Sequence, residues 1–305
     1  MEKINKLYKN TYLIISTITV LMILLVFKKT YYGLYNLKLS ELKNTEQIIA
    51  NVVYIIFAIT TSLSFFIKHK PDSLEEFTKY LKLALIGLGT IIVYKITPIL
   101  ELAILYYSRI DVSKMSITAK TIFLIICETS IMLIIILINR NKLKENIKRI
   151  KHDYNKHFSK CLKYYILALI IMIISNLIIN KLTGSIAANE ETIRTTFNKA
   201  PVYIFFSAVV FAPFVEEMVF RNSIKNIIKN KKTFIIISGL IFGGAHIIGN
   251  ITTIYDVLYI IPYGAPGIIL AYMLAKTDNI FLPMGIHFLH NGLLMTLQLI
   301  PLFLK

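Results

Sequence analysis

Long apolar segments separated by short polar ones run along the whole chain. A membrane-spanning α-helix needs about 20 consecutive, predominantly apolar residues, and nine runs approach that length. They cover residues 11–27, 48–67, 83–107, 121–139, 164–180, 201–220, 233–249, 257–275 and 280–300. The pattern predicts an all-α, polytopic membrane protein of eight or nine transmembrane helices, since Lys95, Pro98 and Glu101 interrupt the run 83–107.

The composition supports lipid as the main solvent of the chain. Hydrophobic residues make up 56% of the 305 residues, compared with roughly 45–50% in soluble domains. The formal net charge is +17, but Lys and Arg form short clusters between apolar runs instead of one basic face. This arrangement argues for the lipid bilayer and against nucleic acid as a partner.

The distribution of basic residues predicts how the chain is oriented. With the N-terminus in the cytoplasm, cytoplasmic segments carry 22 Lys and Arg residues and external segments carry 11. Cytoplasmic loops normally hold this excess, and the longest basic connector is 140–163. The Ile-, Lys- and Asn-rich composition is typical of an AT-rich bacterial genome, so we expect a multi-pass protein of a bacterial plasma membrane with a cytoplasmic N-terminus.

Ionisable side chains within the spans concentrate in the last third of the chain. Each costs on the order of 2.5–3.5 kcal/mol at the centre of a membrane helix, so it needs a partner or a role. We therefore divide the chain into an N-terminal transmembrane region, 1–200, of unassigned role, and a region 201–305 that carries the chemistry. Lys95, Glu101 and Glu128 fall in the first region and are expected to pair with one another or to line a substrate path.

Two adjacent carboxyl groups lie in the run that begins at residue 201. Glu217 and Arg221 have the i,i+4 spacing and order of a helical ion pair. Neighbouring helix residues point about 100° apart, so Glu216 faces elsewhere. A carboxyl group without a local cation in low-dielectric surroundings is suited to exchange a proton near neutral pH, as a general base must.

The following runs carry histidines at matching depths. Glu216 and His246 are equally distant from the turn between their runs, so an antiparallel hairpin puts them at one level, and Gly243 permits a close approach of the helices. His287 and Asn291 share a helical face at i,i+4 and lie at a similar depth. We expect these four side chains from three helices to converge in one pocket.

Together these segments resemble the motifs of the CPBP intramembrane protease family, which includes the CAAX prenyl endopeptidases and bacterial Abi-type proteins. The resemblance covers roughly residues 201–296 and identifies the region 201–305 as a CPBP-like protease core, with the active site in a C-terminal helix bundle. The motifs are Glu216-Glu217-x-x-x-Arg221, Phe242-x-x-x-His246 and His287-x-x-x-Asn291.

The resemblance implies an intramembrane endopeptidase that hydrolyses a peptide bond inside or at the edge of the membrane. Glu216 would activate a water with help from His246, while His287 and Asn291 would hold or polarise the carbonyl as its oxyanion develops. Two forms of this chemistry remain open. Glu216, His246 and His287 suffice as ligands for zinc, and the same atoms can work as a metal-free glutamate protease.

Supporting roles follow for the other motif residues. Glu217 and Arg221 would hold their helix in place, and Phe242 would support His246 within its motif. His290 lies beside the last motif and is expected to be a packing or interface histidine.

The implied substrate is a membrane protein or a small secreted peptide. Because bacteria generally lack prenylated CAAX proteins, a bacteriocin or pheromone precursor, or self-immunity to a bacteriocin, is a better hypothesis than a prenylated protein. Two other classes compete: an ion- or proton-coupled transporter, in which buried Glu and His residues form the ion path, and a non-catalytic membrane partner with the same fold.

Overall fold

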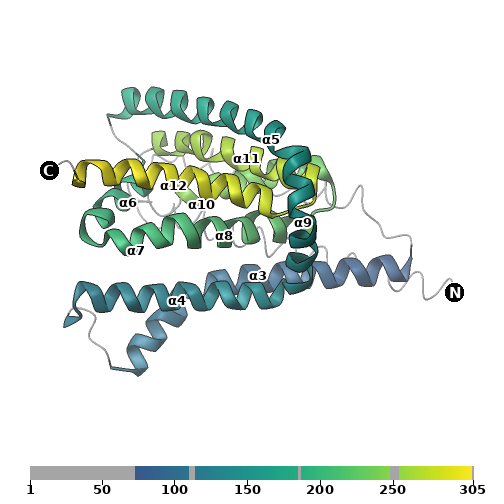
Figure 1. The fold of residues 1–305 in the computed structure, drawn as a ribbon, viewed down its shortest axis with the longest axis horizontal. Coiled ribbons are helices and arrows are strands. Elements are labelled where there is room, and N and C mark those ends of the chain that lie inside the picture. The colour runs from purple at the N-terminus through teal and green to yellow at the C-terminus, as the bar shows by residue number, and fades with distance from the viewer. Residues whose placement is uncertain (1–72, 110–113, 185–186, 248–253, 304–305) are drawn as a thin grey trace, which may run out of the picture. The chain divides into compact units, whose positions relative to one another are not determined.

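The computed structural model describes residues 73–109, 114–184, 187–247 and 254–303, so the predicted spans 11–27 and 48–67 lie outside it. Every element within the described ranges is a helix (Figure 1), which confirms the all-α prediction. Among these residues, five helices are long and apolar enough to cross a membrane, while the total of eight or nine stays a prediction. The five are Leu74–Lys95, Ile117–Ile138, Arg140–Thr183, Pro201–Ile227 and Asp256–Thr277.

The chain divides into two compact units. The first takes in the residues up to Leu85, Leu167–Asn189 and Ile224–Ala271, and the second takes in Ile86–Ile166, Glu190–Ser223 and Tyr272–Lys305. Four helices contribute residues to both units: α3 (Leu74–Tyr107), α5 (Arg140–Thr183), α6 (Ala188–Lys199) and α11 (Ile260–Thr277). The predicted division into 1–200 and 201–305 is a separate, functional one and stays a prediction.

The span Pro201–Ile227 is an irregular helix. Proline fits the first turn of a helix, where its missing N–H is not needed, and Pro201 opens this one. Two π-helical turns interrupt it further along, and such turns are rare and frequently found at functional sites. The successive elements are α7 (Pro201–Phe206), the π turn η2 (Ser207–Phe211), α8 (Ala212–Glu216), the π turn η3 (Glu217–Ser223) and α9 (Ile224–Ile227).

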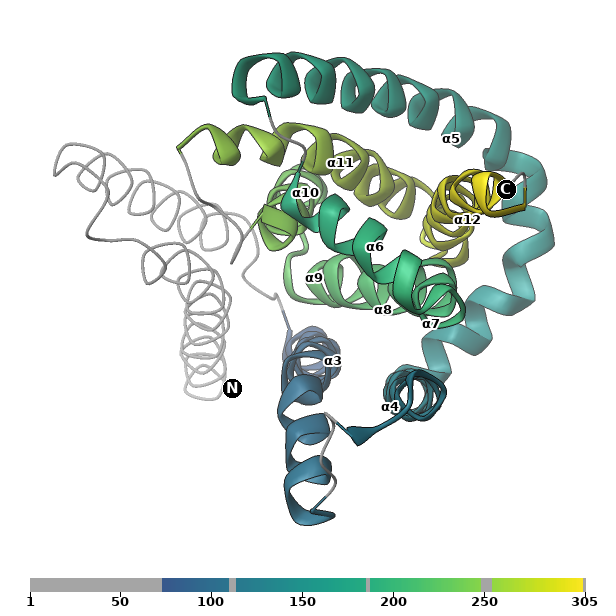
Figure 2. The same ribbon diagram turned by 90° about the vertical axis from the view of Figure 1, so that its left-hand side faces the viewer.

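In the second unit this irregular helix packs between α4 (Ile117–Ile138) and α12 (Phe281–Phe303). Figures 1 and 2 both show α7 and α8 between those two helices. A buried apolar cluster includes Val209 of η2 and Met295 of α12. The outward side chains of α4 and α12 are large and apolar, as Leu137 and Leu293 show with 66% and 63% exposure, and lipid is the solvent that suits them.

The first unit holds α10 (Lys231–Ile247), the 3₁₀ turn η4 (Ile254–Tyr259) and most of α11. Glycines bring the backbones of α10 and α11 together: a Cβ atom on Gly243 would lie 2.9 Å from the backbone nitrogen of Gly264. Small residues allow this kind of close helix packing in membranes. The helix that lies close to Gly243 is therefore α11, whereas the close approach that we expected there, to the run 201–220, stays a prediction.

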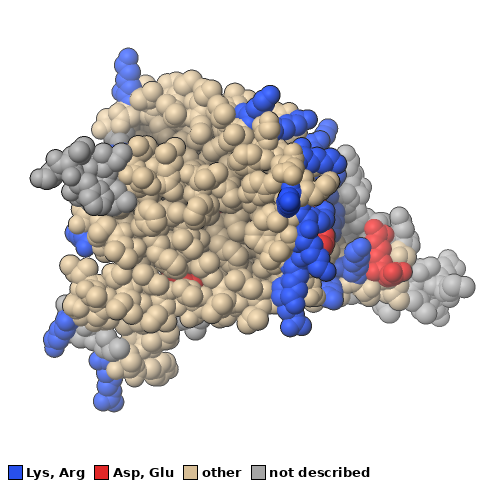
Figure 3. Space-filling view, viewed as in Figure 1, with Lys and Arg blue, Asp and Glu red and all other residues tan. Residues whose placement is uncertain are grey.

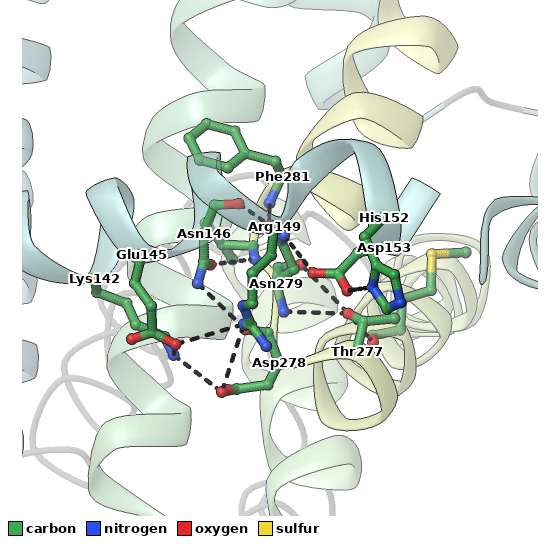
Figure 4. Close-up of polar contacts among 12 residues, drawn as sticks. Lys142, Glu145, Asn146, Arg149, His152, Asp153, Thr277, Asp278, Asn279 and Phe281 are labelled. Atoms are coloured by element: carbon green, nitrogen blue, oxygen red, sulfur yellow. Dashed lines mark hydrogen bonds and ion pairs between the residues drawn. The ribbon is translucent and has the colours of Figure 1, made fainter. Parts of the chain in front are cut away.

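The basic connector 140–163 is helical and continuous with the following span in α5. Figure 3 shows Lys and Arg side chains gathered over this first half of α5. In the second unit, polar side chains of this half bind the turn before α12 (Figure 4). The Asn279 amide donates to Asp153 at 2.7 Å, and Arg149 donates to the carbonyl of Asp278 at 2.8 Å. Because these contacts fix the start of α12, they also set the position of His287.

Candidate active site

The second unit brings Glu217, Arg221 and His287 into direct contact. The predicted ion pair is present, with Arg221 Nη1 at 3.3 Å from Glu217 Oε1, and neither side chain is exposed. The same carboxylate oxygen lies 2.9 Å from His287 Nδ1. Glu217 therefore links the η3 turn to α12 through His287. It also pairs with Arg221, one helical turn away.

This contact determines which nitrogen of His287 is left for chemistry. An ionised carboxylate offers only acceptors, so His287 Nδ1 must carry the proton that it shares with Glu217. The opposite nitrogen, Nε2, faces Glu216 Oε2 at 3.8 Å. That distance is too long for a direct hydrogen bond, so the two atoms face each other without bonding directly.

The two adjacent carboxyl groups differ in access to solvent. The Glu216 side chain is 18% exposed, whereas the Glu217 side chain is fully buried. The sequence interpretation gave Glu217 a role through Arg221 alone, and that interpretation was incomplete, because His287 is closer to Glu217 than to Glu216. Spacing along one helix could not reveal a contact made to another helix 70 residues further along.

Asn291 is held by a backbone carbonyl in the η2 turn. In this turn the N–H of Ala212 donates to the carbonyl of Ser207, five residues earlier. The same pattern would pair the carbonyl of Ala208 with Pro213, which has no N–H. Asn291 Nδ2 fills the vacancy by donating to the Ala208 carbonyl at 2.7 Å. Asn291 and His287, one helical turn apart on α12, thus both contact the helix that carries Glu216.

His246 lies in the first unit, on α10, so its predicted meeting with Glu216 stays a prediction. Within that unit His246 Nδ1 bonds to the carbonyl of Phe242 at 2.9 Å, and a carbonyl can only accept. The proton is therefore on Nδ1, and Nε2 is unprotonated in the neutral ring. Phe242 and Tyr263 flank the imidazole, with ring centroids at 4.4 and 4.8 Å.

Comparisons with known proteins give a family match for the part of the chain that carries these residues. Residues 198–293 match the family model of the type II CAAX prenyl endopeptidase Rce1-like proteins. The matched segment, residues 198–293, is called the Rce1-like domain below. The domain includes all three motifs, from Glu216 to Asn291.

Two bacterial relatives support the assignment of the Rce1-like domain. The membrane-embedded CAAX protease MroQ of Staphylococcus aureus (strain USA300) is 29% identical over 232 residues, which cover 70% of this chain and 89% of MroQ. YdiL of Bacillus subtilis (strain 168), a proposed membrane peptidase, is 29% identical over 121 residues, or 39% of this chain and 46% of YdiL. No solved structure matches the chain.

The described residues of the Rce1-like domain do not form a metal site. Among the described residues, no three His, Cys, Asp or Glu side chains are grouped so that they could hold a metal ion. His287 donates its Nδ1 proton to Glu217, a bond that metal-binding histidines also commonly make, so Nε2 is the atom that would hold a metal. A catalytic zinc site takes three protein ligands. The reaction proposed below uses the side chains alone.

Other intramembrane ionisable residues have partners outside the motifs of the Rce1-like domain. Glu128 of α4 accepts hydrogen bonds from Ser207 Oγ at 2.7 Å and from Tyr203 Oη at 3.2 Å. His290 stacks edge-on against Tyr165 at 5.9 Å between ring centroids, as a packing histidine would. Glu128 stands out in the sequence as an acid in an apolar run, but no local pattern indicates these partners.

Proposed function

We propose that this chain is an intramembrane endopeptidase in which Glu216 activates the attacking water. The observation that carries the proposal is the unequal use of the two adjacent carboxyl groups. Glu217 is buried and bound to both Arg221 and His287, whereas Glu216 is partly exposed and faces His287 Nε2. A general base must reach a solvent molecule, and of the two carboxyl groups only Glu216 is exposed.

The proposed reaction needs no covalent intermediate. Glu216 takes a proton from water as the water oxygen attacks the peptide carbonyl carbon, and a tetrahedral oxyanion forms. His287, protonated on Nε2, and the second N–H of the Asn291 amide donate to that oxyanion. Glu216 then delivers its proton to the leaving nitrogen as the C–N bond breaks.

The remaining motif residues orient these groups. The Glu217 carboxylate accepts a hydrogen bond from His287 Nδ1 and stabilises the imidazolium form. The buried aspartate of a catalytic triad acts on its histidine in the same way. Arg221 balances the charge of Glu217. We propose that His246 assists Glu216 through Nε2, since its Nδ1 bonds to the Phe242 carbonyl.

For the substrate, we propose a membrane-associated protein or a small secreted peptide, such as a bacteriocin or pheromone precursor. Two observations support this class: the motif helix Pro201–Ile227 is apolar enough to cross a membrane, and the relatives are bacterial, one of them described as a membrane-embedded CAAX protease. A role in self-immunity to a bacteriocin fits the same chemistry.

Cleavage of membrane peptides by the purified full chain in liposomes tests the function. We expect Glu216→Gln and His287→Ala each to lower kcat by about 10²–10⁴-fold, the usual contribution of a positioned acid or base. The matched control is Glu190→Gln, which makes the same substitution in an exposed ion pair with Arg194 and should cleave like wild type.

Four results would decide against parts of this proposal. Equal cleavage by all variants would remove Glu216 and His287 from the reaction. Ion flux without cleavage would favour a transporter, and absence of both would favour a non-catalytic partner. Loss of activity on chelation, restored by zinc, would replace the metal-free form of the mechanism with a metal-assisted one.

A further inference from the structure

Glu128 is a membrane-buried acid that lies outside the Rce1-like domain and has no place in its motifs. It sits in the middle of α4, in the second unit, with 6% of its surface exposed. An ionisable side chain at such a depth is costly and usually has a function. Its hydrogen-bond partners indicate what that function is.

The contacts of Glu128 fall on the η2 turn and the residues just before it. Ser207 Oγ and Tyr203 Oη both donate to the same carboxyl oxygen, Oε1, at 2.7 and 3.2 Å. Ser207 is the first residue of η2. Glu128 thus ties one side of this π turn to α4.

The other side of the same turn is tied to the active site. Ala208, the residue after Ser207, presents its carbonyl to Asn291 Nδ2 at 2.7 Å. A π turn lacks the regular backbone bonding of an α-helix, so its geometry depends more on outside partners. The continuous path runs from Glu128 to Ser207, along one peptide unit to Ala208, and on to the Asn291 amide.

A parallel contact strengthens the case that α4 supports this helix. Asn139, the residue that caps the end of α4, accepts a hydrogen bond from Asn222 of the η3 turn at 3.1 Å and donates to Thr90 at 2.9 Å. Each of the two π turns that flank Glu216 is therefore bound by one polar side chain at or near α4.

We propose that Glu128 is a positioning residue for catalysis: it anchors the η2 turn, and through the Ala208 carbonyl it orients the Asn291 amide toward the reacting carbonyl. The inference rests on the proposed proteolytic function. It extends the working site beyond residues 198–293 to a helix that carries none of the three motifs.

The first test measures anchoring without activity, by hydrogen–deuterium exchange of the purified chain in detergent. Glu128→Leu removes the acceptor of both hydrogen bonds, and we expect amides of residues 204–211 to exchange at least about fivefold faster, as local opening becomes easier. The control is Ser130→Ala, because the Ser130 hydroxyl bonds only to the Ile126 carbonyl of its own helix. Unchanged exchange in Glu128→Leu would overturn the anchoring claim whatever the enzyme does.

The second test measures cleavage of the best peptide found for wild type. We expect Glu128→Leu to lower kcat by about 10- to 100-fold, the usual consequence of a misplaced catalytic group, with KM changed less than about twofold. Glu128→Gln keeps an acceptor oxygen and should stay within about threefold of wild type. A raised KM with unchanged kcat would place Glu128 on the substrate path and overturn the positioning role.

A double-mutant cycle separates positioning from general support. If Glu128 acts through Asn291, the effects of the two substitutions on kcat are not additive. Adding Glu128→Leu to Asn291→Ala should then lower kcat by less than about threefold further. Additive losses would overturn the path through Asn291. A wild type that cleaves no peptide would defeat the proposed function and the catalytic part of this inference, while the exchange experiment still decides the anchoring.

Discussion

At the scale of single residues, Glu216 and Glu217 show how position on a helix separates two identical side chains. Glu217 is fully buried between Arg221 and His287, at 3.3 and 2.9 Å, and so is fixed. Glu216 keeps 18% of its side chain exposed and is left to react. The carboxylate, the guanidinium and the imidazole depend on one another, since removing one leaves an uncompensated buried charge.

We therefore predict that Arg221→Leu alone destabilises the chain by about 3–5 kcal/mol, because it strands the Glu217 carboxylate in a buried site. Replacing both members, with Arg221→Leu and Glu217→Leu, should recover much of that loss, as paired apolar replacements of buried ion pairs do. The measurement is equilibrium unfolding in mixed micelles. A double variant less stable than the single one would contradict this account of the pair.

The sequence predicted part of this residue arrangement. The i,i+4 spacing was sufficient for the pair Glu217–Arg221, because both residues are on one helix and the geometry is local. The bond between Glu217 and His287 joins helices far apart in sequence, so no local pattern encodes it. The partner of Asn291 was also out of reach, since it depends on a π turn that frees the Ala208 carbonyl.

At the scale of elements, the helices hold the site through features that hydropathy does not show. The predicted apolar runs within the described ranges are all helical, but α3 and α5 begin well before those runs, at Leu74 and Arg140. The π turns η2 and η3 and the continuation of the basic connector into α5 were not predicted. Hydropathy reports burial in lipid, whereas these features follow from Pro213 and from polar partners on neighbouring helices.

The glycine contact of α10 gives a prediction at this scale. Gly243→Ala should destabilise the chain by about 1–3 kcal/mol, the usual cost of overpacking, because its Cβ would lie 2.9 Å from a backbone atom of α11. Gly89→Ala is the matched control, since nothing lies within 4 Å of a Cβ there, and alanine favours the helix. Thermal unfolding of the two variants in detergent compares them.

If Gly243→Ala were as stable as Gly89→Ala, the close approach of α10 and α11 would not be a tight one. Because α10 also carries His246, we expect the destabilised variant to lose cleavage activity as well. The control should keep full activity.

At the scale of the whole molecule, the described contacts agree with the predicted membrane orientation. The positive-inside pattern puts the connector 140–163 and the turn near Asp278 on the same side, and the two segments are in contact, with Lys142 Nζ at 3.0 Å from the Asp278 carboxylate. The cytoplasmic location of that side and of the N-terminus stays a prediction. Within the described ranges the chain is all-helical, and residues 198–293 match the Rce1-like family model.

The central claim is that Glu216 activates a water that attacks the peptide carbonyl directly. A single turnover in H₂¹⁸O, followed by mass spectrometry of peptide and protein, tests it. We predict one ¹⁸O atom in the new carboxyl terminus of every product molecule, no label in the carboxyl group of Glu216, and no product with Glu216→Gln. Label in Glu216 would instead show a covalent intermediate on that residue, and full cleavage by Glu216→Gln would contradict the account altogether.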